Sequence, residues 1–190
     1  MKTIAIVPIT SQQISEIVAL DQLCFGGLWT EDGYLRELES PNSSLFALSV
    51  REPNLVTFNP KIIGMCCLWS IVEEAHITLL GIHPDYRGEG LGQLLLYVLF
   101  KDALKRKLKW ATLEVKTNNH PAISLYKKFG FKIVGKRKGY YRSTGEDALI
   151  LWNKDLERPE FTQHLADWQK KIENRLCCQY ILTPSEESKA

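Results

Sequence analysis

The stretch that decides the fold runs from Ile82 to Gly92 and reads I-H-P-D-Y-R-G-E-G-L-G. An apolar run precedes it and a leucine-rich run with helical spacing follows it, so the stretch predicts a turn between a strand and a helix. The glycines allow close backbone approach to a ligand, and the first N–H groups of a helix attract anions. The pattern therefore predicts a cradle for a phosphate group, with Arg87 as an added cation. An ordinary glycine-rich turn is the alternative.

Outward from this turn, the chain predicts an α/β (α+β) domain whose sheet is largely antiparallel. Two other nucleotide-binding turns are excluded, because the sequence contains neither G-x-x-x-x-G-K-[ST] nor G-x-G-x-x-G. Helices are expected to begin at a Ser11 cap, at Thr30, at the glycine turn and at Ala122. Strands are expected over 4–9, 44–50, 61–72, 76–83, 110–116, 131–136 and 148–152, with loops over 51–60 and 139–147.

The composition excludes several classes of protein. A length of 190 residues favours one domain, and a net charge of +2 is too small for a general nucleic-acid binder. The sequence has no apolar run of about 18 residues and no signal-peptide pattern at its N-terminus, so we expect a cytoplasmic protein that does not enter a membrane. Five cysteines, with two adjacent pairs, favour reduced thiols over disulfides or a zinc site, so no metal is expected.

A second block runs from Leu113 to Phe131 and reads L-E-V-K-T-N-N-H-P-A-I-S-L-Y-K-K-F-G-F. Together with Arg87, Gly90 and Gly92, which fill the pattern [RQ]-x-x-G-x-[GA], this block resembles the GNAT superfamily of N-acetyltransferases over residues 3–156. The segments L-W-T at 28–30, K-G-Y-Y at 138–141 and E-D-A at 146–148 resemble its RimI branch, the ribosomal-protein-alanine N-acetyltransferases. The resemblance implies a mixed, mostly antiparallel central sheet flanked by helices, and acetyl-CoA as co-substrate.

The same resemblance implies how the coenzyme is held. The strand ending at Ile82 would lay its backbone along the pantetheine arm like an added strand, and Asn119 would hold that arm. Gly81 would also permit a bulge that separates its strand from the next one, with close packing as the alternative. For Asn119 the alternative is a helix cap, and the two roles are compatible. The implied coenzyme-binding residues are Leu80, Gly81, Ile82, Arg87, Gly88, Glu89, Gly90, Leu91, Gly92 and Asn119.

Two residues would carry the chemistry. Glu114 alternates with buried positions on its strand, which alone predicts a solvated face, but the resemblance implies a general base that removes the proton of the incoming ammonium. Tyr126 would be the general acid at the coenzyme sulfur, with a packed helical tyrosine as the alternative. An α-amine has a pKa of about 7.7–8.0 and a lysine about 10.4, so a carboxylate base suits protein N-termini better by about 3 kcal/mol.

The resemblance further implies a protein N-terminus, such as that of a ribosomal protein, as the acceptor. Trp29, and Tyr140 and Tyr141 in the loop before the last strand, would line a peptide groove. The segment G-L-W-T at 27–30 departs from the F-P-W-[ST] of the branch, which bears on peptide specificity. The alternatives are an acetyltransferase for lysines or small amines and a non-catalytic acyl-CoA-binding sensor, and the intact Glu114 and Tyr126 weigh against the sensor.

Residues 157–190 lie outside the resemblance and predict a helix followed by a disordered tail at 186–190. Docking of the apolar face of this helix onto its own domain is the expectation, and a dimer or partner surface is the alternative. The face consists of Phe161, Leu165, Trp168, Ile172 and Leu176.

Overall fold

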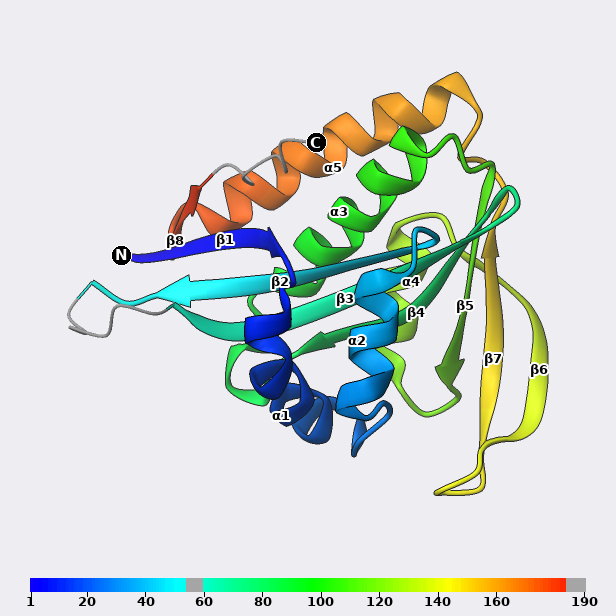
Figure 1. Cartoon of the computed structure of the whole chain (residues 1–190). Coiled ribbons are helices and arrows are strands. Elements are labelled where there is room, and N and C mark those ends of the chain that lie inside the picture. The colour runs from blue at the N-terminus through cyan, green and yellow to red at the C-terminus, as the bar shows by residue number, and fades with distance from the viewer. Residues whose placement is uncertain (54–59, 184–190) are drawn as a thin grey trace.

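The computed structural model describes residues 1–53 and 60–183 and has one mixed sheet at its centre (Figure 1). The described residues form eight strands in the order β6-β7-β5-β4-β3-β2-β1-β8. Neighbouring strands are antiparallel except in two parallel pairs, β4 with β5 and β1 with β8, so the predicted mostly antiparallel sheet is confirmed. The strands are β1 (Lys2–Pro8), β2 (Ser43–Arg51), β3 (Lys61–Ile71), β4 (Glu74–Ile82), β5 (Trp110–Lys116), β6 (Lys132–Tyr141), β7 (Glu146–Asn153) and β8 (Tyr180–Thr183).

Helices cover both faces of the sheet. The helices α1 (Ile14–Phe25) and α2 (Glu31–Glu39) pack on one face, and α3 (Leu91–Lys105), α4 (His120–Lys128) and α5 (Pro159–Leu176) pack on the other. This arrangement explains the nearly continuous apolar runs of β2 and β3, which are buried on both sides. Within the described part of the chain, no helix is long and apolar enough to cross a membrane.

The strands β4 and β5 separate soon after they meet. Their parallel pairing includes only Glu74, Ala75 and His76 of β4. Two residues further along β4, Thr78 is an extra residue between those that pair with Leu68 and Cys67 of β3. The bulge is therefore at Thr78, and the predicted bulge at Gly81 is wrong.

Close packing is what requires a glycine at position 81. A Cβ atom added to Gly81 would lie 2.9 Å from Cζ of Phe25 and 3.2 Å from Cβ of Cys24. The helix α1 can thus approach β4 only because this position has no side chain, which was the alternative reading of the residue.

Two local expectations differ from the structure. Thr10 rather than Ser11 begins the first helical turn, and its N–H donates to Oε1 of Gln13 at 2.9 Å. Tyr140 and Tyr141 belong to β6 rather than to a loop, because β6 continues beyond the predicted strand end. The predicted loop at 51–60 and tail at 186–190 lie partly or wholly outside the described residues.

The segment after residue 156 adds a helix and a strand to the domain. The apolar face of α5 packs against the sheet and α3, with Phe161, Leu165 and Ile172 each 3 % exposed. The ring of Trp168 packs against that of Phe129 in a tilted arrangement, with ring centroids 4.4 Å apart. The strand β8, which the sequence did not predict, then pairs in parallel with β1 and extends the sheet. The predicted helical face is thus buried against its own domain.

Candidate active site

The glycine turn forms the connection from β4 to α3 that the sequence predicts. A short 3-10 turn at Pro84–Tyr86 leads into it, and Gly88 and Gly90 have φ angles of +82° and +100°. These left-handed conformations favour glycine and aim successive N–H groups into one concave surface. The helix α3 begins at Leu91, and its first N–H groups have no acceptors within the helix. This geometry fits a phosphate group.

The side chain of Arg87 turns back from the glycines. Its Nε donates to the carbonyl oxygen of Ile82 at 3.0 Å, and that same oxygen accepts from Sγ of Cys24 at 3.4 Å. Arg87 therefore fixes the end of β4, and its Nε is not available to a ligand at the turn. Its charge and its other N–H donors remain, so the role of Arg87 as an added cation stays a prediction.

An unpaired strand edge leads from the interior to the turn. Beyond His76, the residues of β4 up to Ile82 have no strand partner on the β5 side among the described residues. Leu80 lies on this segment, and a Cβ atom on Gly92 would lie 3.9 Å from its Cδ2 atom and 3.4 Å from Cδ2 of Leu125 in α4. The edge, the turn and α4 thus meet at one place. Such an edge can bond an extended chain that carries amides, and the turn can hold phosphates at its end.

Asn119 is the N-cap of α4, with its Oδ1 accepting the N–H of Ala122 at 3.3 Å. This is the alternative role given for Asn119, and its side chain remains exposed at the start of the helix. The side-chain amide nitrogen is not used by the cap, so the second role stays compatible with it.

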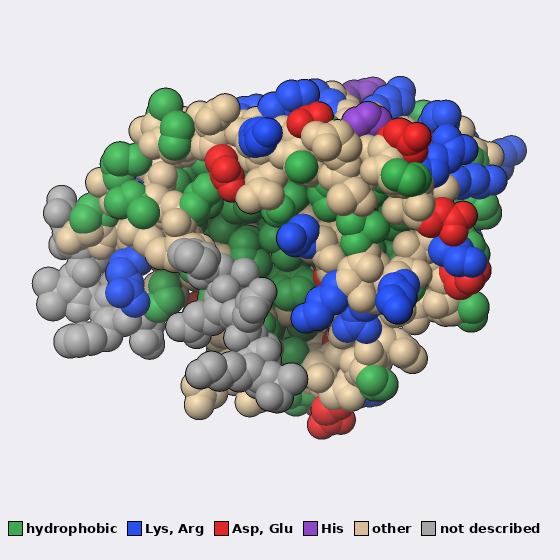
Figure 2. Space-filling view, turned by 90° about the horizontal axis from the view of Figure 1, so that it is seen from above, with side chains coloured by type: hydrophobic (Ala, Val, Ile, Leu, Met, Phe, Trp, Pro, Cys, Tyr) green, Lys and Arg blue, Asp and Glu red, His purple; other side chains and the backbone are tan. Residues whose placement is uncertain are grey.

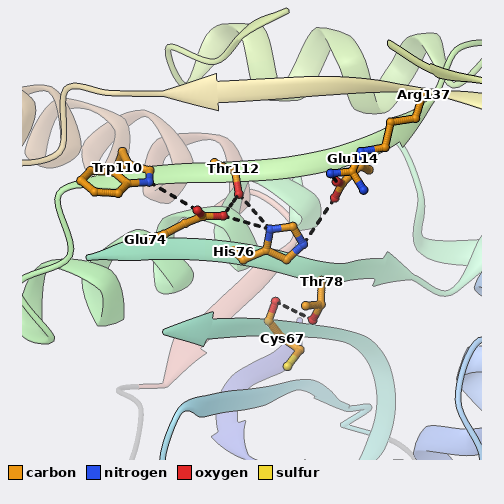
Figure 3. A network of polar contacts seen from close by, with 8 residues as sticks. All are labelled: Cys67, Glu74, His76, Thr78, Trp110, Thr112, Glu114 and Arg137. Atoms are coloured by element: carbon orange, nitrogen blue, oxygen red, sulfur yellow. Dashed lines mark hydrogen bonds and ion pairs between the residues drawn. The ribbon is translucent and has the colours of Figure 1, made fainter. Parts of the chain in front are cut away.

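Glu114 of β5 is the centre of a row of polar side chains from three strands (Figure 3). Its Oε2 lies 3.3 Å from Nε2 of His76 in β4, and its Oε1 lies 3.3 Å from Nη2 of Arg137 in β6. On the other side of the imidazole, Nδ1 lies 2.8 Å from Oγ1 of Thr112 and 3.2 Å from Oε1 of Glu74. We call Glu74, Thr112, His76, Glu114 and Arg137 the polar row.

The Glu114 side chain is not solvated, although strand alternation alone had predicted a solvated face, whereas Arg137 at the end of the polar row is 54 % exposed. The Glu114 side chain is 9 % exposed and Thr112 is 4 % exposed. His76 from the neighbouring strand and Arg137 from β6 cover the carboxylate. Contacts at both of its ring nitrogens fix the orientation of His76, and two contacts likewise fix the Glu114 carboxylate.

Tyr140 and Tyr141 lie near Glu114, and Tyr126 is buried in the core near Tyr141. The rings of Tyr140 and Tyr141 are perpendicular with centroids 5.2 Å apart, and the Arg137 guanidinium lies 5.5 Å from the centre of the Tyr140 ring. Burial and then the charges of Tyr140 and Glu114 raise the pKa of Tyr141 to about 12. Burial, followed by the proximity of Tyr141, raises the pKa of Tyr126 well above its usual value. Tyr126 therefore keeps its proton and can donate a hydrogen bond at neutral pH.

A line of aromatic rings leads from the surface to the polar row. Trp29 stacks on Trp69 with nearly parallel planes and centroids 6.1 Å apart, and Trp69 stacks on His76 at 6.2 Å. The buried Asp21 holds the start of this line, because its carboxylate accepts the N–H of Trp29 at 2.9 Å and the hydroxyl of Tyr34 at 2.7 Å. We call Trp29, Trp69 and His76 the aromatic line.

The structure thus brings Tyr140 and Tyr141 near Glu114, the aromatic line joins Trp29 to them, and Tyr126 lies near Tyr141. Sequence reasoning missed His76, Arg137 and Trp69 as members of this site. No local motif marks them, because they come from β4, β6 and β3, and only the strand order brings them next to Glu114. In residues 1–53 and 60–183, no three His, Cys, Asp or Glu side chains are grouped to hold a metal ion.

A large groove lies away from this site. It has a volume of about 1950 Å³ and is bordered by β1, β2, α3 and α5. Figure 2 shows it from above as a hollow with hydrophobic side chains on its floor. Neither Glu114 nor Tyr126 lines it, so the candidate active site rests on side-chain chemistry and the open strand edge rather than on this groove.

Comparison with known proteins relates this geometry to a family. Residues 14–131 match the Acetyltransferase (GNAT) family. The chain is 34% identical over 142 residues to the "Putative [ribosomal protein bS18]-alanine N-acetyltransferase" of Bacillus subtilis (strain 168), an alignment that covers 74% of this chain and 89% of the relative. It is 35% identical over 98 residues to the "[Ribosomal protein bS18]-alanine N-acetyltransferase" of Escherichia coli (strain K12), which covers 50% of this chain and 66% of that protein.

Solved structures show the same fold. The crystal structure of the ribosomal-protein-S18-alanine N-acetyltransferase from Escherichia coli aligns with a TM-score of 0.65 and 26% identity, covering 80% of this chain and 92% of that one. The structure of Ard1 from Thermoplasma volcanium aligns with a TM-score of 0.68 at 21% identity, covering 82% and 99%, and supports the fold alone. Family membership implies acetyl-CoA as the acetyl donor. The chain belongs to the GNAT family and is an N-acetyltransferase.

Proposed function

We propose that this N-acetyltransferase acetylates the N-terminal α-amine of a protein, and that the alanine N-terminus of ribosomal protein bS18 is its acceptor. Two similar proteins are named for this reaction. The observation that carries the proposal is the Glu114 carboxylate, 9 % exposed, at the inner end of the aromatic line. An acceptor in the ribosome implies that the enzyme acts in the cytoplasm.

The coenzyme residues of the proposal follow the strand edge and the turn. The pantetheine arm would bond the free backbone edge at Leu80, Gly81 and Ile82, and the pyrophosphate would bind the N–H groups from Gly88 to Gly92. The support is physical: β4 has no partner on its β5 side at that edge, and both Gly88 and Gly90 have positive φ angles. The carbonyl of Ile82 already accepts two bonds, so Leu80 and Gly81 would contribute the larger share of the contacts.

The proton chemistry of the proposal belongs to Glu114 and Tyr126. The ammonium loses a proton to the Glu114 carboxylate, and the neutral nitrogen then forms a bond to the acetyl carbon. The thioester carbon–sulfur bond breaks, the sulfur leaves with the bonding electrons, and this thiolate takes up the second proton that the acylated nitrogen releases, which gives the amide and the free thiol. The Tyr126 hydroxyl donates a hydrogen bond to that sulfur, because its raised pKa disfavours complete proton transfer before the bond breaks.

The preference for α-amines follows from the pKa difference between the two kinds of amine. Near pH 7 roughly a tenth of α-amines are neutral, whereas well under a thousandth of lysine amines are. One carboxylate therefore has about 3 kcal/mol less to supply for an N-terminus than for a lysine. The rings of Trp29, Trp69 and Tyr140 would line the path by which the first residues of the acceptor reach Glu114.

A pair of peptides tests the proposal. The first carries the free alanine N-terminus of bS18 and one internal lysine, and the second has the same sequence with a blocked N-terminus. We expect mass spectrometry to find acetyl groups on the α-amine, with a kcat/KM at least about tenfold higher for the free peptide. Equal acetylation of the blocked peptide would make the protein a lysine acetyltransferase. Acetylation of neither peptide, with turnover of free small amines, would favour a small-amine enzyme.

A further inference from the structure

The last turn of α5 lies on the glycine turn, although the two are far apart in the sequence. Nη2 of Arg175 donates to the carbonyl oxygen of Gly88 at 2.7 Å. A Cβ atom added to Gly90 would lie 2.8 Å from Nε and 2.9 Å from Cδ of the same arginine. The guanidinium of Arg175 is therefore in direct contact with the two glycines that shape the turn.

The rest of the C-terminal segment holds Arg175 in this place. The next residue, Leu176, is completely buried in the core, and Tyr180 is 4 % exposed at the start of β8. The hydroxyl of Tyr180 donates to the carboxylate of Glu89, the residue between the two glycines. Burial and this hydrogen bond raise the pKa of Tyr180 well above its usual value, so the phenol remains a donor at physiological pH.

Two arginines lie at the turn, and Arg175 has the more direct contact with its glycines. Nε of Arg87 is bound to the Ile82 carbonyl, so the arginine of the motif points back along β4. Among the described residues, no carboxylate forms an ion pair with Arg175 within 4.0 Å, and one of its five N–H donors bonds Gly88. Glu89, the acidic residue of the turn, is bonded by Tyr180 instead. A guanidinium with free donors beside a phosphate cradle matches the planar, bidentate recognition of phosphate.

We propose that Arg175 is a further coenzyme-binding residue, which supplies from α5 the cation that binds a phosphate group of acetyl-CoA at the turn. The proposal rests on the proposed binding of the coenzyme at Gly88–Gly92. It gives the C-terminal segment a function: α5 and β8 position one positive charge on the glycines of the turn.

Calorimetry on the full chain tests the proposal with three variants. Arg175→Gln removes the charge but keeps an amide that can donate to Gly88, and Arg175→Lys keeps the charge. Arg158→Gln is the matched control, because Arg158 lies at the opposite end of α5, about 25 Å away for a helix of this length. We expect Arg175→Gln to weaken acetyl-CoA binding about tenfold, Arg175→Lys to weaken it less, and Arg158→Gln to leave it unchanged.

A phosphate-free donor separates phosphate binding from a structural role. With S-acetylpantetheine, Arg175→Gln should turn over a peptide at the wild-type rate, because this donor has no phosphate for Arg175 to bind. Equal loss of activity with both donors, or a wild-type acetyl-CoA affinity in Arg175→Gln, would overturn the proposal and leave Arg175 as a support of the fold. A thermal melt of each variant verifies folding, and if Arg175→Gln does not fold, Arg175→Met takes its place.

The test also separates this proposal from the one on which it rests. If wild-type protein binds acetyl-CoA no better than S-acetylpantetheine, the phosphate site itself is wrong. If wild-type protein binds acetyl-CoA tightly and the Arg175 variants do so equally, only the role of Arg175 is wrong. Acetyl-dephospho-CoA assigns the phosphate: an Arg175→Gln effect that persists with it points to the pyrophosphate, and an effect that disappears points to the 3′-phosphate.

Discussion

The glycine turn and the polar row are two parts of one site that are built in opposite ways. The turn uses the backbone of consecutive residues between β4 and α3, and its geometry depends on φ angles that favour glycine. The polar row uses side chains from β4, β5 and β6, and its geometry depends on which strands are neighbours. A backbone site can therefore be recognised in a short stretch of sequence, whereas a side-chain site becomes visible only when the sheet is assembled.

This difference implies a division of work between the two parts. Changes in the turn should affect the binding of acetyl-CoA, because the turn would contact the phosphates and not the reacting atoms. Changes in the polar row should affect the rate of acetyl transfer, because Glu114 would contact the amine. Substitutions at Glu114, Gly90 and His76 test whether the effect on acetyl-CoA binding and the effect on the rate of acetyl transfer can be separated.

The largest effect is expected for Glu114→Gln. The substitution keeps the shape of the side chain and removes the base, so kcat/KM at pH 7 should fall about 10²- to 10⁴-fold. Calorimetry should show an unchanged acetyl-CoA affinity, because the polar row lies apart from the glycine turn. A large loss of acetyl-CoA binding in this variant would show that the turn and the polar row do not have separate roles.

The next largest effect is expected for Gly90→Val, which should weaken acetyl-CoA binding at least about tenfold. Valine strongly disfavours the φ of +100° at this position, and its Cβ would meet the Arg175 side chain at 2.8 Å. Gly135→Ala is the control, since a Cβ there makes only ordinary contact with Ile150 at 3.4 Å. Unchanged acetyl-CoA affinity in Gly90→Val would contradict the placement of the phosphates at the turn.

A smaller effect is expected for His76→Gln, in which a residue that positions Glu114 loses its contact at 3.3 Å. The loss of one such contact should lower kcat about fivefold, with the KM for acetyl-CoA unchanged. The measurement is steady-state kinetics with both substrates varied. If His76 only stabilises the fold, the melting temperature will fall while the kcat of the folded enzyme stays at the wild-type value.

The smallest effect is expected at the hairpin between β6 and β7, which carries Arg137, Tyr140 and Tyr141. Hydrogen bonds from Lys116, Thr144 and Asn118 lower the pKa of Glu146 to about 2 from a usual value of 4.5. Because the folded-state pKa is the lower one, this stabilisation is present above about pH 4.5 and is lost as the pH falls toward 2.

Glu146→Gln should therefore lower the melting temperature by about one to two degrees at pH 7. The difference from wild type should shrink as the pH is lowered from 5 to 2.5 in a series of calorimetric melts. A difference that stays constant over this range would show that the ionised carboxylate is not the source of the effect.

The difference between a site built from consecutive backbone and one built from side chains of several strands also explains which features the sequence could predict. The turn, the helices and most strands follow from local spacing, and the second sequence block indicated Glu114 and Tyr126. The partners of Glu114 could not be found in this way, because His76 reaches it only where β4 and β5 begin to separate. Strand β8 was missed because it is short and pairs with β1 from the far end of the chain.

The exposure of β6 accounts for another error. Most residues of this strand are exposed, so it has little of the alternation between apolar and polar residues that marks a half-buried strand. The prediction therefore ended the strand early and assigned Tyr140 and Tyr141 to a loop. Their position on a strand places them near Glu114, whose charge acts on both phenols.

The most direct test of the account is the pH dependence of kcat/KM for Glu114→Gln and wild type, measured with one α-amine peptide from pH 6 to 9. An enzyme without its base reacts only with amine that is already neutral. The logarithm of kcat/KM for Glu114→Gln should therefore rise with pH with a slope of about one below the amine pKa of about 8. Wild type should show a flatter profile, so the gap between the two should narrow about tenfold between pH 7 and pH 9. Parallel profiles over the whole range would contradict the assignment of Glu114 as the base.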